Sequence, residues 1–321
     1  MRIAVAGSGR LAAGLIGELT RTHHRVVAVL QNGRAVRGFR RTLDTRLAGL
    51  LGNDLSVLCW ARRLGAPVVW LDKQTDEELA PLRALRPDLL LVGGYSIILK
   101  RPTLDIATVG SVNVHSSLLP RHRGPNPFQS VIMQGEKESG VTYHVIEEGI
   151  DTGGIIEQAT FPLEPLDTMM TVYRRSCDLA HMMVTGVMDG IERDGIHPRP
   201  QDESLASYNK KAVEADSWID WRWPAEKIDR LVRALVPIPM PRFLYEARVV
   251  QVMRVRWSPL PVDAAPGTVL ALRPAVRVAT GLGTVDLVGA FTKRPVPWIW
   301  PPPWSGLKLG DQLPVGKGDA P

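Results

Sequence analysis

An asparagine, a histidine and an aspartate stand where the sequence pattern ends a strand or makes a turn. Asn113 and His115 are two residues apart in an apolar, β-branched stretch, so a strand there places both side chains on one face. Asp151 lies in a glycine-bracketed turn, residues 147–154, between two further apolar runs. An amide, an imidazole and a carboxylate brought together could stabilise an oxyanion and move a proton.

The strand that carries Asn113 and His115 is predicted from Ala107 to Val114, and a polar loop broken by proline and glycine follows it. In an open parallel sheet, ligands bind beyond the carboxyl ends of the strands, so we expect these side chains at the mouth of a cleft. Taken singly, Asn113 and His115 could hydrogen-bond their own turn, and Asp151 could cap one.

Strand and helix patterns alternate over residues 1–195, which predicts an α/β catalytic domain built on a Rossmann-like, doubly wound parallel sheet. The predicted strands cover 3–6, 25–30, 67–71, 88–93, 107–114, 140–146 and 155–161. The predicted helices cover 11–19, 54–64, 76–85, 127–134 and 167–193.

The remaining third of the chain has a different pattern. Residues 196–213 are polar and contain prolines, which predicts a linker. Residues 214–321 then carry a helical pattern at 224–235, four short strand patterns and a proline- and tryptophan-rich tail. Closely spaced short strands are typical of a small β-barrel, here predicted from segments 248–255, 267–272, 276–279 and 284–288.

The composition is that of a soluble globular protein, with 45% hydrophobic and 22% charged residues among 321. Cys59 and Cys177 both fall in apolar helical patterns, which favours reduced buried thiols and a cytoplasmic location. No Cys/His cluster has the spacing of zinc ligands, and no apolar run is long enough to span a bilayer. The chain enters a predicted strand at once, so we expect no signal peptide.

A glycine motif near the amino terminus resembles the fingerprint of dinucleotide-binding domains. Gly7-Ser-Gly9 follows a predicted strand and opens a predicted helix. A dehydrogenase should place a carboxylate at the end of the second strand, but that strand ends in Gln31-Asn32. The glycines are better explained as a tight turn that lets helix and strand approach closely, which disfavours a hydride-transferring enzyme.

Positive charge gathers in one segment. The formal net charge is +6, which allows an anionic partner without requiring one. The segment after the second predicted strand, residues 33–46, holds one acidic residue and several arginines, so it is either a solvated loop or an anion-binding one. These arginines are Arg34, Arg37, Arg40, Arg41 and Arg46.

The block from Asn113 to Gly124, followed by Gly140-Val-Thr142 and 149–153 (Gly-Ile-Asp-Thr-Gly), resembles the formyltransferase family. That family uses 10-formyltetrahydrofolate as donor and includes methionyl-tRNA formyltransferase, glycinamide ribonucleotide transformylase and sugar N-formyltransferases. The resemblance covers nearly the whole chain, because segments 201–208, 219–225 and 266–269 are similar to the linker and the small open β-barrel (OB-like) domain of the methionyl-tRNA enzyme.

The resemblance implies that Asn113, His115 and Asp151 are the catalytic residues and that no metal is needed. Asn113 would donate a hydrogen bond to the formyl oxygen as it becomes anionic. His115 would donate as well, with Asp151 orienting its ring and favouring its charged form. Asp151, directly or through a water, would take the proton that leaves the amine.

The resemblance also places the folate ring among backbone groups of two loops and against the wall formed by a third. The implied positions are Gly93, Gly94, Tyr95, Ile97 and Leu99 in the first loop, Glu148, Gly149 and Ile150 in the second, and Ser117, Leu118, Leu119 and Pro120 in the wall.

The sequence leaves two candidates for the acceptor amine, methionyl-tRNA and a small molecule. The arginine-rich segment stands where methionyl-tRNA formyltransferases carry a basic loop, and its phosphate contacts could serve a tRNA or a nucleotide diphosphate. Three departures favour a small amine, such as an amino sugar or a secondary-metabolite amine. The first turn reads Gly-Ser-Gly-Arg-Leu, the loop after Gly124 reads Pro-Asn-Pro-Phe, and the arginine segment is longer and poorer in lysine. The predicted acceptor-binding residues are Arg34, Arg37, Arg40 and Arg41.

A protein of another class stays as an alternative: a nucleic-acid-binding protein that kept the fold without catalysis. Asn113, His115 and Asp151 argue against it, because a binding protein gains nothing from keeping all three.

Overall fold

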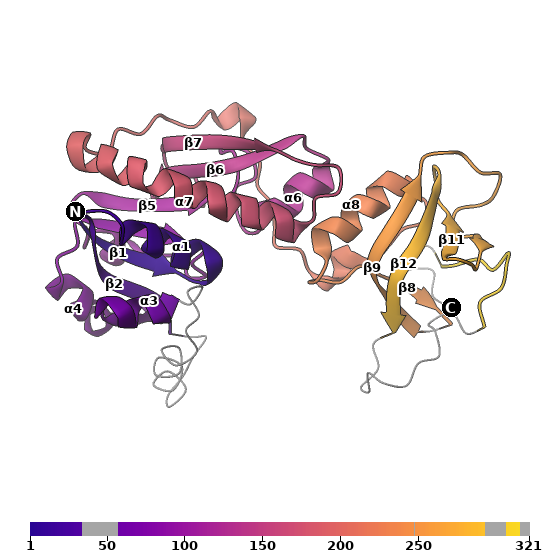
Figure 1. The fold of residues 1–321 in the computed structure, drawn as a ribbon, viewed down its shortest axis with the longest axis horizontal. Helices are drawn as coiled ribbons and strands as arrows, with labels where there is room; N and C mark the ends of the chain where they lie inside the picture. The colour runs from indigo at the N-terminus through magenta and orange to yellow at the C-terminus, as the bar shows by residue number, and fades with distance from the viewer. Residues whose placement is uncertain (34–56, 247, 293–305, 315–321) are drawn as a thin grey trace. The chain divides into compact units, whose positions relative to one another are not determined.

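The computed structural model describes residues 1–33, 57–246, 248–292 and 306–314, which form two compact units (Figure 1). The first unit takes Met1–Pro127, Glu138–Pro162 and Tyr173–Asn209. The second takes Phe128–Lys137, Leu163–Val172 and the chain from Lys210 onward. The domain boundaries predicted from the sequence, with a linker at residues 196–213, remain a prediction.

A seven-stranded sheet in the order β3-β2-β1-β4-β5-β6-β7 forms the centre of the first unit. The strand order reverses between β1 and β4, so the doubly wound fold predicted from the alternation of patterns is confirmed. β1 to β5 run parallel, whereas β6 and β7 pair antiparallel at one edge, which the alternation did not predict. The strands are Arg2–Gly7 (β1), Arg25–Asn32 (β2), Val68–Leu71 (β3), Leu89–Gly93 (β4), Gly110–His115 (β5), Glu138–Val145 (β6) and Ile155–Pro162 (β7).

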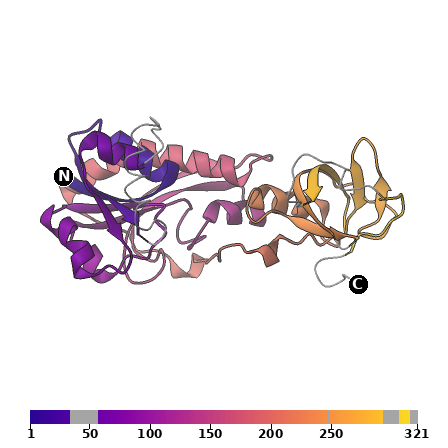
Figure 2. The same ribbon diagram turned by 90° about the horizontal axis from the view of Figure 1, so that it is seen from below.

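Helices lie on both faces of this sheet (Figure 2). Alternate residues of β1 separate the two cores, since Ile3 and Val5 pack with α1, α3 and α7, whereas Ala4 and Ala6 pack with α4. In the ranges that the structure describes, no helix is long and apolar enough to cross a bilayer. The helices of the first unit are Gly9–Leu19 (α1), Val57–Leu64 (α3), Asp76–Ala84 (α4), Arg101–Leu104 (α5) and Met169–Asp194 (α7), whose first residues fall in the second unit; the short α5 was not predicted. Helix α6 (Pro127–Gln134) belongs almost wholly to the second unit.

The second unit contains a five-stranded antiparallel sheet in the order β10-β11-β12-β9-β8 and the helix α8 (Ala225–Leu235). Trp221 is fully buried and meets Phe243 edge to face, with ring centroids 5.4 Å apart. This curled sheet confirms the small β-domain predicted from the short strands, and β8 is the strand that the pattern missed. The strands are Arg242–Tyr245 (β8), Arg248–Ser258 (β9), Val269–Ala271 (β10), Val276–Ala279 (β11) and Thr284–Thr292 (β12).

The glycine turn after β1 lies at the point where the strand order reverses. Gly7 pairs with Gly93 of β4, and a Cβ on Gly7 would lie 2.1 Å from the Gly93 carbonyl oxygen and 2.7 Å from Ala12 Cβ. The missing side chain therefore lets β1, β4 and the start of α1 approach one another, in agreement with the tight turn inferred from the sequence.

We predict that Gly7→Ala lowers the free energy of unfolding by about 2 kcal/mol or more, because a side chain there must displace backbone atoms. Gly186→Ala is the matched control, since a Cβ on that exposed glycine of α7 would meet no described atom within 4 Å. The control should be neutral or stabilising by up to about 1 kcal/mol. Urea denaturation of both variants checks this, and equal stability of the two would contradict the close-approach explanation.

Candidate active site

β5 presents Asn113 and His115 on one side of the sheet, as the strand period requires. Its antiparallel neighbour β6 sets Thr142 opposite His115 and His144 opposite Asn113. His115 is buried and Asn113 is half-buried. Four polar side chains from two neighbouring strands therefore gather near the carboxyl end of β5.

The turn between β6 and β7 brings Asp151 to the same place. Asp151 has a φ of 55°, a left-handed conformation that is uncommon for a residue other than glycine. The side-chain amide of Gln201 holds this turn by donating to the carbonyl oxygens of Asp151 at 2.8 Å and Gly153 at 2.7 Å. The Gly124 N–H donates to Asp151 Oδ2 at 2.8 Å. The carboxylate is thus fixed from the loop after β5 and from the segment around residue 201.

The structure brings the three predicted catalytic side chains together. Asn113 Nδ2 lies 3.3 Å from Asp151 Oδ1, and His115 Nδ1 lies 3.6 Å from Asp151 Oδ2. His115 Nε2 lies 2.9 Å from the carbonyl oxygen of His122, so this nitrogen carries the hydrogen and donates it. The neutral ring then turns the lone pair of Nδ1 toward the carboxylate.

His144 joins this cluster, although spacing along the chain had given it no role. Its Nε2 lies 3.0 Å from Asn113 Nδ2 and 3.5 Å from Asp151 Oδ1, and its Nδ1 lies 2.8 Å from the Val145 carbonyl oxygen. A hydrogen on Nδ1 leaves Nε2 to accept from Asn113, which fixes the direction of the amide. The two-residue spacing of Thr142 and His144 on β6 indicates that their side chains share one face. The sequence could not place that face at the site, because this requires knowing that β6 pairs with β5.

His122 is buried and supports the loop after β5. Its N–H donates to Ser207 Oγ at 2.8 Å, and its Nδ1 lies 2.9 Å from Asn209 Nδ2. Since the His122 carbonyl oxygen accepts from His115, residues 207–209 hold the loop that orients the His115 ring.

The pKa values of Asp151 and His115 are both lowered, so both groups are deprotonated at neutral pH, but for different reasons. Burial by itself raises the pKa of Asp151, but the imidazoles of His144 and His115 and the Gly124 N–H overcome this and lower the pKa to about 2. Burial lowers the pKa of His115, and the attraction of Asp151 does not compensate for it. Asp151 thus favours the charged form of His115, as the resemblance implied, but burial outweighs this attraction and the ring is neutral at neutral pH.

The predicted folate-binding residues stand before and after the cluster residues along the chain, and they differ in solvent exposure. Gly93 ends β4, Gly94 follows it, and the half-buried Tyr95 has a buried hydroxyl without a hydrogen-bond partner among the described residues. Burial raises the pKa of Tyr95. Ile97 and Leu99 are half-buried, whereas Glu148, Gly149 and Ile150 are exposed.

The predicted wall is fixed by hydrogen bonds. Ser117 is fully buried and donates to the Arg121 carbonyl oxygen at 2.9 Å, and the Leu119 N–H donates to Thr142 Oγ1 at 3.2 Å. Leu118 fills the space beside Gly140, and the peptide bond from Leu119 to Pro120 is cis.

A cavity of about 340 Å³ lies beside the Asp151 turn. Its lining comprises Arg123, Ile150, Thr152, Ala206, Ser207 and Tyr208, of which only Ile150 was predicted as a site residue. Arg123 is buried and its guanidinium is bound by Gln201 and Glu203, so this cation is neutralised within the segment that forms one wall. The predicted acceptor-binding residues Arg34, Arg37, Arg40 and Arg41 lie outside the described residues, and their role stays a prediction.

Comparison with known proteins gives consistent matches. A formyl transferase family model matches residues 1–188, and a model of the formyl transferase C-terminal domain matches residues 211–293. A methionyl-tRNA formyltransferase of Acidithiobacillus ferrooxidans (strain ATCC 53993 / BNL-5-31) is 34% identical over 289 residues, which cover 89% of this chain and 90% of that protein.

Two solved structures share the fold at low identity. One is WlaRD, a sugar 3N-formyl transferase solved in the presence of dTDP and 5-N-formyl-THF, with a TM-score of 0.65, 17% identity, and coverage of 89% of this chain and 97% of that one. The other is an N-formyltransferase from Helicobacter canadensis in complex with folinic acid and dTDP-3-aminofucose, with a TM-score of 0.64, 18% identity, and coverage of 89% and 99%.

We predict that His115 titrates below the ordinary histidine pKa of about 6.5 in the free protein, because burial penalises the imidazolium. Asp151→Asn should lower this pKa further, since it removes the anion that faces Nδ1. The unfolded chain binds this proton more readily, so protonation of His115 should favour unfolding as the pH falls below about 6.5. NMR titration of the histidine ring protons checks both shifts, and a His115 pKa above 6.5 would contradict this electrostatic account.

Proposed function

The chain belongs to the formyl transferase family, whose members transfer formyl groups, and we propose that it moves the formyl group of 10-formyltetrahydrofolate to a primary amine. The observation that carries this proposal is the convergence of Asn113 and His115 on the Asp151 carboxylate, within 3.3 and 3.6 Å. A folate donor is supported by the two neighbours solved with 5-N-formyl-THF and with folinic acid.

Asn113 is suited to stabilise the negative charge that develops on the formyl oxygen. The acceptor nitrogen attacks the formyl carbon, which becomes tetrahedral, and its oxygen becomes anionic. The Asn113 amide donates to His144 Nε2 at 3.0 Å and to Asp151 Oδ1 at 3.3 Å, so its two N–H groups are both engaged in the free protein. The longer bond, to Asp151, is the one to be exchanged for the formyl oxygen, while the bond to His144 keeps the amide oriented.

Asp151 is suited to accept the proton that the attacking amine must lose. The carboxylate is ionised at neutral pH and its partners keep it in place, but a pKa of about 2 makes it a weak base, so the proton has to pass on to a stronger base. Collapse of the intermediate breaks the bond between the formyl carbon and the folate nitrogen, which takes up a proton as it leaves. His115 presents an unprotonated Nδ1 to Asp151, so the pair can share the proton during this step.

The folate would lie against the loop after β4, the turn before Asp151 and the wall 117–120. Tyr95 offers a buried hydroxyl that no described residue binds, and a polar group of the ring system could satisfy it. The backbone at Gly93 and Gly94 allows a flat ring to approach closely.

A small amine is the favoured acceptor class. The cavity beside the Asp151 turn has about 340 Å³, near the lower end of the range that binds small molecules, about 300–1,000 Å³. The departure at Pro125-Asn126-Pro127 directly follows Gly124, the residue that binds Asp151. One structural neighbour is a sugar 3N-formyl transferase and the other was solved with dTDP-3-aminofucose, which supports an acceptor such as an amino sugar.

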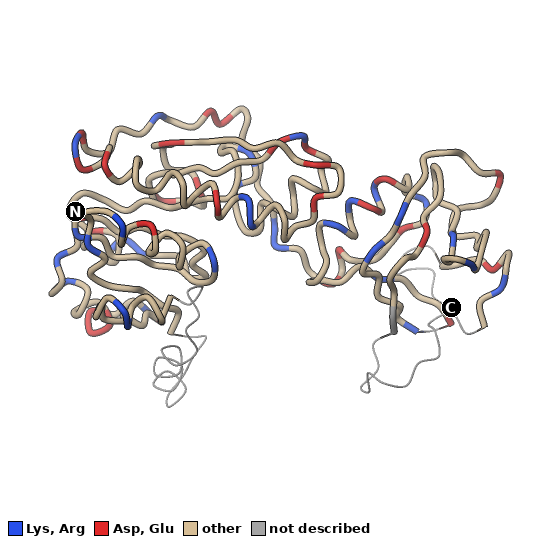
Figure 3. Tube along the Cα trace, viewed as in Figure 1, with Lys and Arg blue, Asp and Glu red and all other residues tan. Residues whose placement is uncertain are grey.

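Initiator methionyl-tRNA is the second candidate, favoured by 34% identity to a methionyl-tRNA formyltransferase over both units. Figure 3 shows positive and negative residues interleaved along both units in the part of the chain that the structure describes. The arginine-rich segment after β2 is therefore the strongest candidate for contacts to tRNA phosphates, which would be sequence-independent and sensitive to salt.

We predict that Asn113→Ala and Asp151→Asn each lower the turnover number about a hundredfold or more while the protein stays folded. The first removes an oxyanion donor and the second removes the proton acceptor. Asp194→Asn is the control, because this exposed aspartate pairs with the exposed Arg193 at the end of α7. Single-turnover formyl transfer with a circular dichroism check separates the effects, and near-normal turnover in Asp151→Asn would refute the proton-transfer role.

The acceptor is decided by offering initiator methionyl-tRNA and a panel of amino sugars and small amines to the enzyme side by side with 10-formyltetrahydrofolate. We expect formylation of a small amine with tRNA left unchanged. Formylated methionyl-tRNA with no small product would overturn the favoured acceptor and leave the proposed chemistry intact. Repeating the assay with Arg37, Arg40 and Arg41 changed to alanine should raise the KM for the acceptor and leave folate affinity unchanged.

A further inference from the structure

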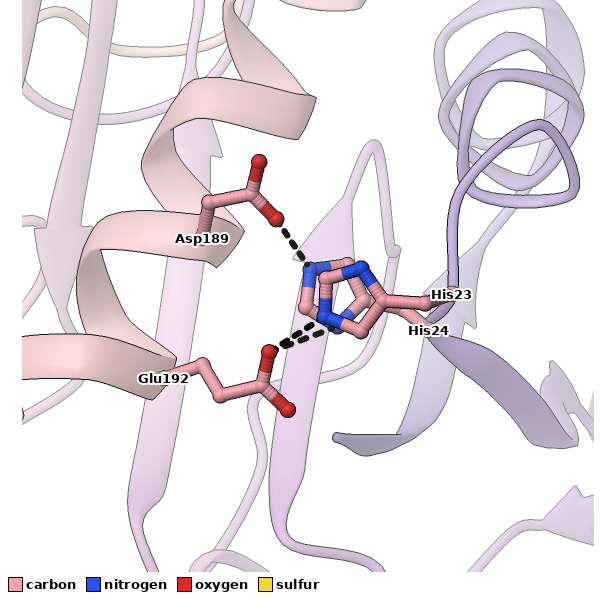
Figure 4. Close-up of side chains that lie close together, drawn as sticks. All are labelled: His23, His24, Asp189 and Glu192. Atoms are coloured by element: carbon pink, nitrogen blue, oxygen red, sulfur yellow. Dashed lines mark hydrogen bonds and ion pairs between the residues drawn. The ribbon is translucent and has the colours of Figure 1, made fainter.

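A second group of histidines and carboxylates lies in the first unit and shares no residue with the Asn113 cluster. His23 and His24 occupy the turn between α1 and β2, and Asp189 and Glu192 lie one helical turn apart on α7 (Figure 4). We infer that these four residues form a binding site for a divalent transition-metal ion, with zinc as the representative ion.

The distances place the donor atoms around one point. His23 Nε2 lies 2.5 Å and His24 Nδ1 3.8 Å from Glu192 Oε2, and His24 Nε2 lies 3.0 Å from Asp189 Oδ1. One ligand atom from each of the four residues lies within 4.8 Å of the others. Zinc bonds of about 2 Å put tetrahedral ligands roughly 3.4 Å apart, so small side-chain rotations suffice.

Those rotations are available where they are needed. The His23 side chain is 63% exposed and that of Glu192 is 36% exposed, so both can turn without repacking the core. His24 is the fixed member, because its side chain is fully buried. A site with one rigid ligand and two adjustable ligands can reach the geometry that the ion prefers.

The roles of the four residues follow from the two sides of the His24 ring. Its Nε2 faces Asp189 at 3.0 Å, so a hydrogen on Nε2 is donated to that carboxylate. The lone pair of Nδ1 then accepts from the Met1 nitrogen at 3.1 Å, on the side where Glu192 Oε2 lies 3.8 Å from Nδ1. A carboxylate behind a ligating histidine orients the ring and raises its basicity. His23, His24 and Glu192 are therefore the ligands, and Asp189 positions His24.

The chemistry of this set fits zinc better than magnesium or calcium. Two imidazoles and one carboxylate are ligands of borderline softness, whereas magnesium and calcium prefer oxygen alone. The Met1 nitrogen also lies here, 3.1 Å from His24 Nδ1 and 2.6 Å from Glu192 Oε1, and would compete with the ion or move aside.

A bound ion would connect two segments that are far apart in the sequence. The turn at His23 and His24 precedes β2, and Glu192 lies in the last turns of α7, which packs on the same core as α1. The ion would thus stabilise the first unit and take no part in formyl transfer.

The test uses the untagged full-length protein, freed of metal with a chelator and titrated with zinc chloride by calorimetry. We expect one zinc ion bound per chain, and a rise in the melting temperature with zinc, because an ion that binds only the folded state stabilises it. The double variant His23→Ala, Glu192→Gln should lose at least tenfold in zinc affinity and the thermal shift, and Asp189→Asn should lose about tenfold.

His197→Ala is the matched control, since this exposed histidine hydrogen-bonds the Asp194 carbonyl oxygen and lies near the same helix end. It should bind zinc like the original protein, and formyl transfer by the double variant should be unchanged. A protein that binds no zinc, or a double variant that keeps one tightly bound ion, would overturn the proposal. In that case hydrogen bonds, including those of the Met1 nitrogen, hold the two histidines and two carboxylates together without a metal ion. Because His23 and Glu192 are exposed, we expect the variants to fold, which circular dichroism checks.

Discussion

The half-buried carboxylate of Asp151 is the constraint on which the candidate site depends. A charge removed from water is costly unless partners replace the lost hydration. Here the donors come from separate segments, the Gly124 N–H from the loop after β5 and the Asn113 amide from β5. The rings of His115 and His144, on β5 and β6, lie 3.6 and 3.5 Å from the carboxylate oxygens. Each partner that stabilises the charge is thereby held at a fixed distance from it, so the electrostatic requirement also determines the geometry of the cluster.

The turn at Asp151 would not hold this position by itself, because the residue has a left-handed backbone conformation. Gln201 compensates by binding the carbonyl oxygens of Asp151 and Gly153, and its own oxygen accepts from the buried Arg123. The segment 201–209 therefore supports the site from outside the sheet: it fixes the Asp151 turn at one end and the His122 loop at the other.

Two groups of histidines in the first unit show how the surroundings of an imidazole change what it can bind. His115 is buried beside a single carboxylate that has several other partners, so its ring stays neutral and takes part in a proton network. His23 and His24 face two carboxylates near the surface, where water and ions have access. We therefore propose acid–base chemistry for the histidine in the first setting and ion binding for the histidines in the second.

The sequence by itself determined most of the fold, since the alternating patterns located the strands, the main helices and the change to a β-domain. It also placed Asn113 and His115 on one face, because the two-residue period of a strand is a local property. Asp151 came from the resemblance of its turn, and its contact with both residues required the folded chain. His144, Gln201 and the pairing of His24 with Glu192 were found only in the tertiary structure. Each depends on strand register or helix packing between segments tens to more than a hundred residues apart, and no local pattern encodes such a distance. The neutral state of His115 was likewise decided by burial, because the cost of removing a charge from water is set by the whole surrounding fold.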